Sequence, residues 1–106
     1  MSSKHGYLLT HFASDDLREI VSYLAAEAGE AIAARIEDEL FACFERLVTH
    51  PGMGHGRSDL TFLPVLFFPV FPYLVIYQRG TSTITIHAIL HSARDVKRTL
   101  KTRFLK

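Results

Sequence analysis

The first half of the chain carries two apolar stripes with helical spacing. Within residues 14–28, apolar side chains recur three and four positions apart: Leu17, Ile20, Val21, Leu24, Ala25 and Ala28. A second stripe, within residues 30–49, consists of Ile32, Ile36, Leu40, Phe44, Leu47 and Val48. This period predicts two amphipathic helices. Because Gly29 alone separates them, we expect an antiparallel helical hairpin.

Polar and helix-ending residues mark the limits of this hairpin. Ser14 is predicted to cap the first helix, because its hydroxyl can accept a hydrogen bond from a free backbone N–H group. Asp15 and Asp16 then lie in the first turn, where the helix dipole favours negative charge. We interpret these two residues and Glu19 as a polar helix face. The sequence His50-Pro51-Gly52 is predicted to end the second helix.

The second half of the chain has the spacing of β-strands. Residues 73–79 are β-branched and aromatic, and residues 83–91 alternate after a polar turn that contains Gly80. The alternation places Ile84, Ile86, Ala88 and Leu90 on one face, and Thr85, His87, Ile89 and His91 on the other. These two segments therefore predict a β-hairpin. Residues 63–69 and 6–12 predict two further strands.

A last helix is predicted after the hairpin. Ser92 is expected to cap it, with Asp95 as the acidic partner of a capping box. Its apolar stripe consists of Val96, Leu100 and Phe104. We expect this stripe to lie against the sheet, with the lysines and arginines facing outward. Pro69 and Pro72 are expected at strand ends or at a sheet edge, because proline cannot donate to a strand ladder.

The predicted order of elements is β-α-α-β-β-β-α. This order indicates an α+β protein with the helical hairpin packed on a largely antiparallel sheet. The length of 106 residues and the apolar fraction of 48% predict one domain over residues 1–106. Cys43, the only cysteine, lies beside the second helical stripe and is predicted to be a small core residue.

The same composition predicts a cytoplasmic protein. A single cysteine allows no intramolecular disulfide, which fits a reducing compartment. The first residues contain no apolar run of the kind found in export signals, so none is expected. The most apolar segment, residues 63–76, is interrupted by three prolines and is too short to span a bilayer.

Charge is divided unevenly along the chain, although the net charge is only +1. Residues 1–50 carry four basic and nine acidic side chains, whereas residues 51–106 carry eight basic and two acidic ones. The basic residues of the last thirteen positions are Arg94, Lys97, Arg98, Lys101, Arg103 and Lys106. This asymmetry indicates that the second half meets an acidic partner. Direct nucleic-acid contact and a merely solvated basic helix are the two alternatives.

Motifs for familiar chemistry are absent from the sequence. The glycine-rich phosphate loops and the G-x-S-x-G nucleophile motif do not occur, so nucleotide-binding and α/β-hydrolase functions lack support. His87 and His91 lie four apart on one predicted strand and would share a face, but no third metal ligand lies near them. We therefore predict no metal and no cofactor.

One set of residues has the chemistry to bind RNA and cleave it. The set comprises Arg57, Tyr73, Tyr77, Arg79, His87, His91 and Arg94. Cations could bind phosphates, and a histidine could activate a ribose 2′-hydroxyl. The structural alternative, which we favour, is that Tyr73 and Tyr77 pack in the sheet and that Arg94 pairs with a carboxylate at the helix start.

The end of the chain resembles a known family. The pattern runs from Tyr73-x-x-x-Tyr77 through a turn to a strand that ends in Leu90-His91, followed by Arg94-Asp95. It resembles the ParE-type (plasmid stabilisation) toxins of the ParE/RelE superfamily. The helical hairpin, Pro51-Gly52 and Arg57-x-Asp59-Leu60 extend this likeness over nearly the whole chain. The resemblance implies a RelE-like fold and the toxin of a bacterial type II toxin–antitoxin pair.

Two activities share this fold, and the resemblance distinguishes them by residue type. RelE-like toxins cut messenger RNA on the ribosome, whereas ParE-like toxins poison DNA gyrase. Where the RelE-like pattern has an arginine, two lysines and a tyrosine, this chain has Leu74, Val65, Phe67 and Leu100. Only Arg94 matches, and His91 is a candidate substitute. We therefore expect a ParE-like gyrase inhibitor that is not a nuclease, with a ribosome-dependent endoribonuclease or a non-toxic binding module as alternatives.

The resemblance also implies a protein partner. We expect a cognate antitoxin that forms a hetero-oligomer with this chain, through a segment that is disordered when free. The expected partner-binding residues are Arg57, Tyr73, Tyr77, Arg94, Lys97, Arg98 and Lys101. If the protein were a nuclease, the weak catalytic candidates would be His91, Arg94, Arg79 and His87.

Overall fold

The computed structural model describes residues 6–92 and 94–104. The elements are β1 (Tyr7–Leu9), α1 (His11–Ala28), α2 (Glu30–Thr49), β2 (Leu66–Val70), β3 (Tyr73–Arg79), β4 (Ile84–His91) and α3 (Val96–Phe104). The predicted α+β class and the order β-α-α-β-β-β-α are confirmed. The expectation of no export signal at residues 1–5, and the basic residue Lys106, lie outside the described residues.

The four strands form one mixed sheet in the order β1-β4-β3-β2. Both hairpin-connected pairs, β2–β3 and β3–β4, are antiparallel, and β1 is parallel to β4. The sheet is thus largely antiparallel, as predicted. Pro69 lies in the edge strand β2, where its missing N–H group interrupts no ladder.

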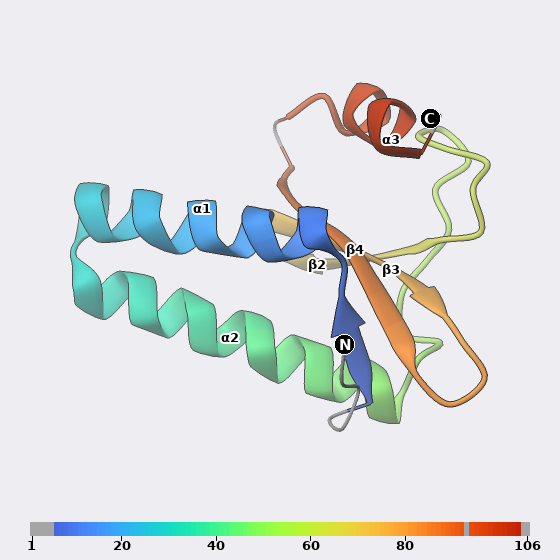
Figure 1. The fold of residues 1–106 in the computed structure, drawn as a ribbon, viewed down its shortest axis with the longest axis horizontal. Helices are drawn as coiled ribbons and strands as arrows, with labels where there is room; N and C mark the ends of the chain where they lie inside the picture. The colour runs from blue at the N-terminus through green and yellow to red at the C-terminus, as the bar shows by residue number, and fades with distance from the viewer. Residues whose placement is uncertain (1–5, 93, 105–106) are drawn as a thin grey trace.

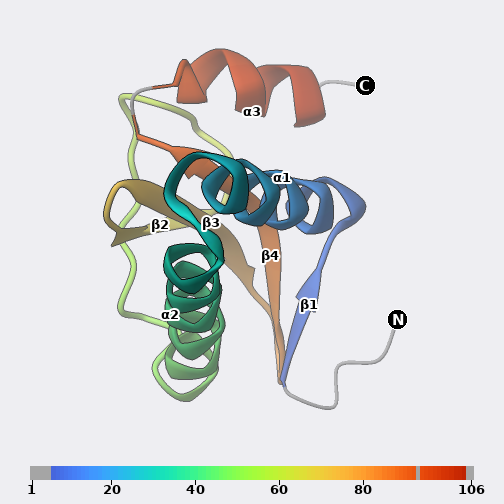
Figure 2. The same ribbon diagram turned by 90° about the vertical axis from the view of Figure 1, so that its left-hand side faces the viewer.

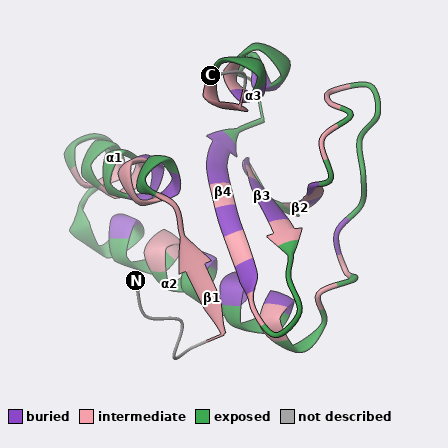
Figure 3. Ribbon diagram, turned by 45° about the vertical axis from the view of Figure 1, so that its right-hand side comes forward, coloured by how far each residue is buried: buried purple, intermediate pink, exposed green. Residues whose placement is uncertain are grey.

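The helices cover the two faces of this sheet unequally. α1 and α2 form the expected hairpin, whose far end reaches beyond the sheet in Figure 1; Figure 2 shows the two helices end-on. Tyr73, Val75 and Tyr77 of β3 join a core cluster with this hairpin, whereas Leu74 and Ile76 join a second cluster with α3. Because neighbouring strand residues point to opposite faces, α3 packs on the face away from the hairpin. β4 between them is mostly buried (Figure 3).

An irregularity at His87 changes which residues of β4 share a face. Ile76 pairs with Ala88, but the next residue, Tyr77, pairs with Ile86, so His87 is an extra residue in β4. Ile84 and Ile86 consequently pack toward the hairpin, whereas Ala88 and Leu90 pack toward α3. The prediction that these four residues share one face is therefore wrong. A strict alternation of residue types does not reveal such a bulge.

Two helix caps also differ from the prediction. Thr10, not Ser14, caps α1: its hydroxyl oxygen accepts the Ala13 N–H at 3.2 Å, and the strand before it is only Tyr7–Leu9. Asp95, not Ser92, caps α3, because its carboxylate accepts the Arg98 N–H at 3.0 Å. In each case a second capping residue lies four or three positions away, and tertiary contacts decide which one is used.

Other boundaries fall close to those predicted. α2 spans the expected residues, and Gly29 before it has a φ of +98°, which favours glycine. β2 begins at Leu66 and not at residue 63, because Leu63 bonds locally to Thr61 and to Val65. Cys43 is fully buried, as predicted, and burial raises the pKa of its thiol to about 11. Within the described residues, no helix combines the length and apolar character needed to cross a bilayer.

Candidate functional site

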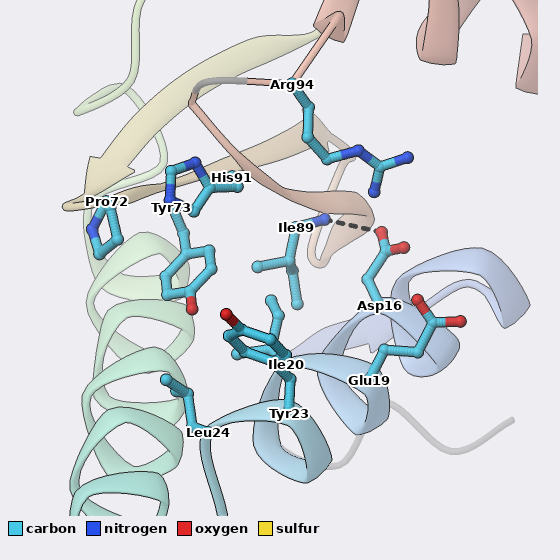
Figure 4. Close-up of a pocket in the computed structure, with 10 residues that line it drawn as sticks. All are labelled: Asp16, Glu19, Ile20, Tyr23, Leu24, Pro72, Tyr73, Ile89, His91 and Arg94. Carbon is cyan, nitrogen blue, oxygen red and sulfur yellow. Dashed lines mark hydrogen bonds between the residues drawn. The ribbon is translucent and has the colours of Figure 1, made fainter. Parts of the chain in front are cut away.

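A cleft lies between α1 and the ends of β3 and β4, and we call it the hairpin cleft. It has a volume of about 560 Å³. It is lined by Asp16, Glu19, Ile20, Tyr23, Leu24, Pro72, Tyr73, Ile89, His91 and Arg94 (Figure 4). Three of the residues singled out in the sequence, Tyr73, His91 and Arg94, are therefore brought together here.

Asp16 closes the polar end of the hairpin cleft and is almost fully buried, with 6% of its surface exposed. Its carboxylate accepts the backbone N–H of Ile89 at 2.9 Å (Figure 4) and two N–H groups of the Arg103 guanidinium, at 2.7 and 2.8 Å. β1 pairs with β4 only as far as Ile86, so Asp16 takes the place of a neighbouring strand at Ile89. Such two-point charged bonds are among the strongest in proteins.

Arg103 joins the last helix of the fold to the first. It comes from α3, binds Asp16 of α1, and its guanidinium lies 4.9 Å from the centre of the Phe12 ring. This contact spans 87 positions in the sequence. The expectation that Asp16 lies on a polar helix face and Arg103 on an outward basic face is therefore wrong, because the two residues neutralise one another in a buried contact.

The opposite end of the hairpin cleft is aromatic. Tyr73 and His91, which pair across β3 and β4, meet edge to face with their ring centres 5.7 Å apart. Burial, and secondarily the nearby Tyr23, raise the pKa of the Tyr73 hydroxyl. Figure 4 shows the hydroxyl groups of Tyr23 and Tyr73 directed toward one another across the cleft. Arg94 lines the cleft without pairing with a carboxylate of the described residues.

A second, more apolar groove lies between residues 60–63 and α3, and we call it the α3 groove. It has a volume of about 420 Å³ and is lined by Leu60, Thr61, Phe62, Leu63, Lys97, Lys101 and Phe104. Lys97 and Lys101 lie one helical turn apart along its rim. The Phe62 side chain is 93% exposed, although phenylalanine is among the residues most often buried in folded proteins.

The remaining residues singled out in the sequence lie outside both hollows. The Tyr77 hydroxyl is buried, donates to the Pro51 carbonyl at 2.7 Å and accepts the Gly54 N–H at 2.9 Å, so it fastens the loop after α2. The Arg57 guanidinium binds Asp59 through two bonds in the exposed loop and lowers the pKa of that carboxyl. Arg79 ends β3, and Arg98 lies on the exposed face of α3 beside Asp95.

His87 and His91 lie on opposite faces of the sheet, contrary to the prediction. The His87 ring contacts Phe104 of α3 and bonds to the Gln78 side chain at 3.0 Å, whereas His91 lines the hairpin cleft. Burial lowers the pKa of His87. The bulge at His87 is the cause of this separation. No three potential metal ligands of the types His, Cys, Asp and Glu gather anywhere in the described part of the chain.

Sequence reasoning missed Asp16, Arg103, Tyr23 and Phe62. Asp16 and Arg103 looked like ordinary members of an acidic and a basic face, and no local pattern connects them. Tyr23 falls off the apolar stripe of its helix, which could have marked it as a surface aromatic. Phe62 directly precedes the proline-containing segment that is predicted as a strand, and the sequence pattern does not show whether its side chain is buried.

Comparisons with known proteins give one family model and a similar solved fold. The family model described as "ParE toxin of type II toxin-antitoxin system, parDE" matches residues 7–96. The solved structure "Chromosomal ParDE TA system from P. aeruginosa" is similar in fold, with a TM-score of 0.67 and 18% sequence identity over 83% of this chain and 98% of the other. No curated protein matches. Since the family model covers most of the sequence, the chain belongs to the ParE toxin family of type II toxin–antitoxin systems.

Proposed function

We propose that this ParE-family protein inhibits DNA gyrase and is neutralised by a cognate antitoxin, and that it does not cleave RNA. The observation that carries the proposal is the chemistry of the sheet face under α3. Positions that hold cationic and acid–base groups in RelE-like nucleases are Val65, Phe67, Leu74 and Leu100 here. All four belong to the apolar cluster between the sheet and α3. A buried apolar face offers no phosphate clamp and no general acid.

The histidine on that face does not restore a nuclease site. His87 is held by Gln78 and covered by Phe104, and burial favours its neutral form. A neutral, half-buried imidazole that is already hydrogen-bonded is a poor ligand for a phosphate. The alternative catalytic pair is His91 and Arg94, which line the hairpin cleft on the other side of the sheet. Their presence in one cleft is the observation that keeps the endoribonuclease as the second candidate.

Expression in bacteria tests the proposed activity. We expect growth arrest with signs of DNA damage. We expect messenger RNA on translating ribosomes to stay intact, because four of the five nuclease positions hold apolar side chains that are buried or, for Leu74, partly buried. The measurements are a DNA-damage reporter in cells and primer extension on transcripts from a purified translation reaction. Cleavage at defined codons that is lost in His91→Ala or Arg94→Ala would instead establish the nuclease. Absence of any arrest would favour the non-toxic binding module.

Charge is expected to speed the encounter with the antitoxin. Lys97, Arg98 and Lys101 are exposed on α3, so an acidic antitoxin segment would be drawn toward them. Replacing all three by glutamate should lower the association rate constant by about tenfold at low salt, with a smaller change in the dissociation rate. The measurement is stopped-flow binding at two salt concentrations.

The matched control reverses three exposed arginines of the hairpin. The control variant replaces Arg18, Arg35 and Arg46 by glutamate. It changes the net charge by the same amount as the reversal on α3, but its residues lie on α1 and α2. Their reversal should slow association less, because steering depends on where the charge lies. Equal slowing by the two triple variants would mean that net charge alone acts, and an unchanged rate in both would mean that the basic helix is a solvated face.

A further inference from the structure

The α3 groove exposes apolar surface that the described chain does not cover. Phe62 projects from the loop into solvent, and Leu60, Leu63 and Phe104 line the groove beside it. Exposed apolar surface that is concave and bordered by polar side chains typically marks a binding site. Phe71 is comparably exposed, at 86%, but it lies on the turn between β2 and β3 and lines neither the hairpin cleft nor the α3 groove.

The rim of the α3 groove is positively charged. Lys97 and Lys101 line it. Asp59 already forms two hydrogen bonds with Arg57, which is the main cause of its lowered pKa, and Lys97 contributes only weakly to that shift. Asp95, at the start of the same helix, caps the Arg98 N–H and lies 3.6 Å from the Arg98 side chain. The two lysines therefore remain available to carboxylates of a ligand.

We propose that the α3 groove is a docking site for the antitoxin, and that it takes an apolar anchor of a segment whose neighbouring glutamates or aspartates bind Lys97 and Lys101. This inference rests on the proposed function, since it assumes that a neutralising antitoxin exists. The occupant follows from charge complementarity: an apolar floor with a cationic rim fits an acidic amphipathic segment.

The hairpin cleft fits such a segment less well. It presents the carboxylates of Glu19 and Asp16 beside Arg94, so its charges are mixed and not uniformly positive. Single-stranded nucleic acid also fits the α3 groove less well, because Lys97 and Lys101 are the only cations among the described residues that line it, too few to follow a phosphate backbone. A segment in the α3 groove would cover the basic face of α3, so that docking there would hide these cations from any other partner.

Affinity for the antitoxin tests the anchor. The antitoxin is defined as the product of an adjacent gene that restores growth on co-expression. Phe62→Ser should weaken its binding about tenfold or more, because truncating a central aromatic contact has effects of this size. Phe71→Ser is the matched control and should leave the dissociation constant unchanged. Both side chains are exposed, so neither variant should unfold, which circular dichroism can verify.

A fluorescent probe locates the segment directly. Thr102→Cys, an exposed position of α3 next to Lys101 that does not line the groove, can be labelled selectively with an environment-sensitive dye near neutral pH, because Cys43 is buried and its pKa is raised to about 11. Antitoxin binding should shift the emission to the blue as the groove is covered. Either of two results would overturn the groove assignment and leave the proposed function standing. One is a tight complex without a shift in emission, and the other is full affinity of the Phe62→Ser variant for the antitoxin.

Two further outcomes separate the possible causes of failure. If no adjacent gene product binds or neutralises the wild-type protein, the proposed function fails, and the groove assignment falls with it. If a single-stranded DNA oligonucleotide shifts the dye and the antitoxin does not, the groove binds nucleic acid and the inference is overturned.

Discussion

Replacing Asp16 by alanine should lower the free energy of unfolding by about 2–4 kcal/mol. The change removes a buried carboxylate that satisfies the Ile89 N–H and both N–H groups offered by Arg103. The Ile89 N–H group then lacks its partner. The charge of Arg103 is left unpaired on a side chain that is only 13% exposed. Arg103 is close to the end of α3, so its side chain can turn toward water. We therefore expect a smaller loss of stability than the largest values found when one partner of a buried ion pair is removed. Urea unfolding followed by circular dichroism measures it, since the chain has no tryptophan.

The neighbouring residue provides the matched control. Asp15→Ala removes the same side chain one position earlier, where the carboxylate is exposed and pairs with Arg18 and His11. The expected loss is about 0.5 kcal/mol or less. Arg103→Met should destabilise as well, and the double variant should lose less than the two single losses together, because the second change removes the charge that the first leaves unpaired. Additive losses, or an Asp16→Ala variant as stable as Asp15→Ala, would contradict the buried pair.

The fold could be predicted well because its signals are local. The 3.6-residue period around Leu17 and Leu40 specified the helical hairpin, and Gly29 specified where it turns. The β-branched segments on both sides of Gly80 specified the β3–β4 hairpin. Each of these signals involves residues that lie within one element or one turn of the chain, where spacing translates directly into a shared face.

Features that depend on distant parts of the chain could not be predicted in this way. Thr10 caps α1 because its own N–H already bonds to Ile86 of β4, which places the start of the helix earlier than Ser14. The extra residue at His87 reverses the faces of β4 after Ile86, and strict alternation cannot reveal it. The Asp16–Arg103 pair joins the first helix to the last. Each depends on tertiary contacts that override the local pattern.

Several residue types singled out in the sequence gather in two hollows of the structure, whereas their arrangement could not be predicted. Tyr73, His91 and Arg94 meet in the hairpin cleft, and Lys97 and Lys101 line the α3 groove. Tyr77, by contrast, is a fully buried residue whose hydroxyl holds the Pro51–Gly54 loop. Sequence alone cannot separate a tyrosine that binds a partner from one that fastens a loop, because both need an aromatic ring and one hydrogen bond.

Replacing Leu40 by alanine should lower the free energy of unfolding by about 2–5 kcal/mol, the range for leucine truncations in packed cores. Leu40 is fully buried on α2 and belongs to the cluster that joins the hairpin to β3 and β4. The change removes apolar contacts and leaves a cavity that a closely packed interior fills only in part. Circular dichroism during urea unfolding gives the loss.

Ile32 provides the comparison on the same helix. Its side chain is 36% exposed, near the far end of the hairpin that reaches beyond the sheet (Figure 1). Ile32→Ala should cost less than about 1 kcal/mol, because little buried surface is lost and alanine favours the helix. The difference between the two variants tests how α2 is rotated against the sheet. A loss below about 0.5 kcal/mol for Leu40→Ala would place Leu40 at the surface and would require α2 to present a different face to the core.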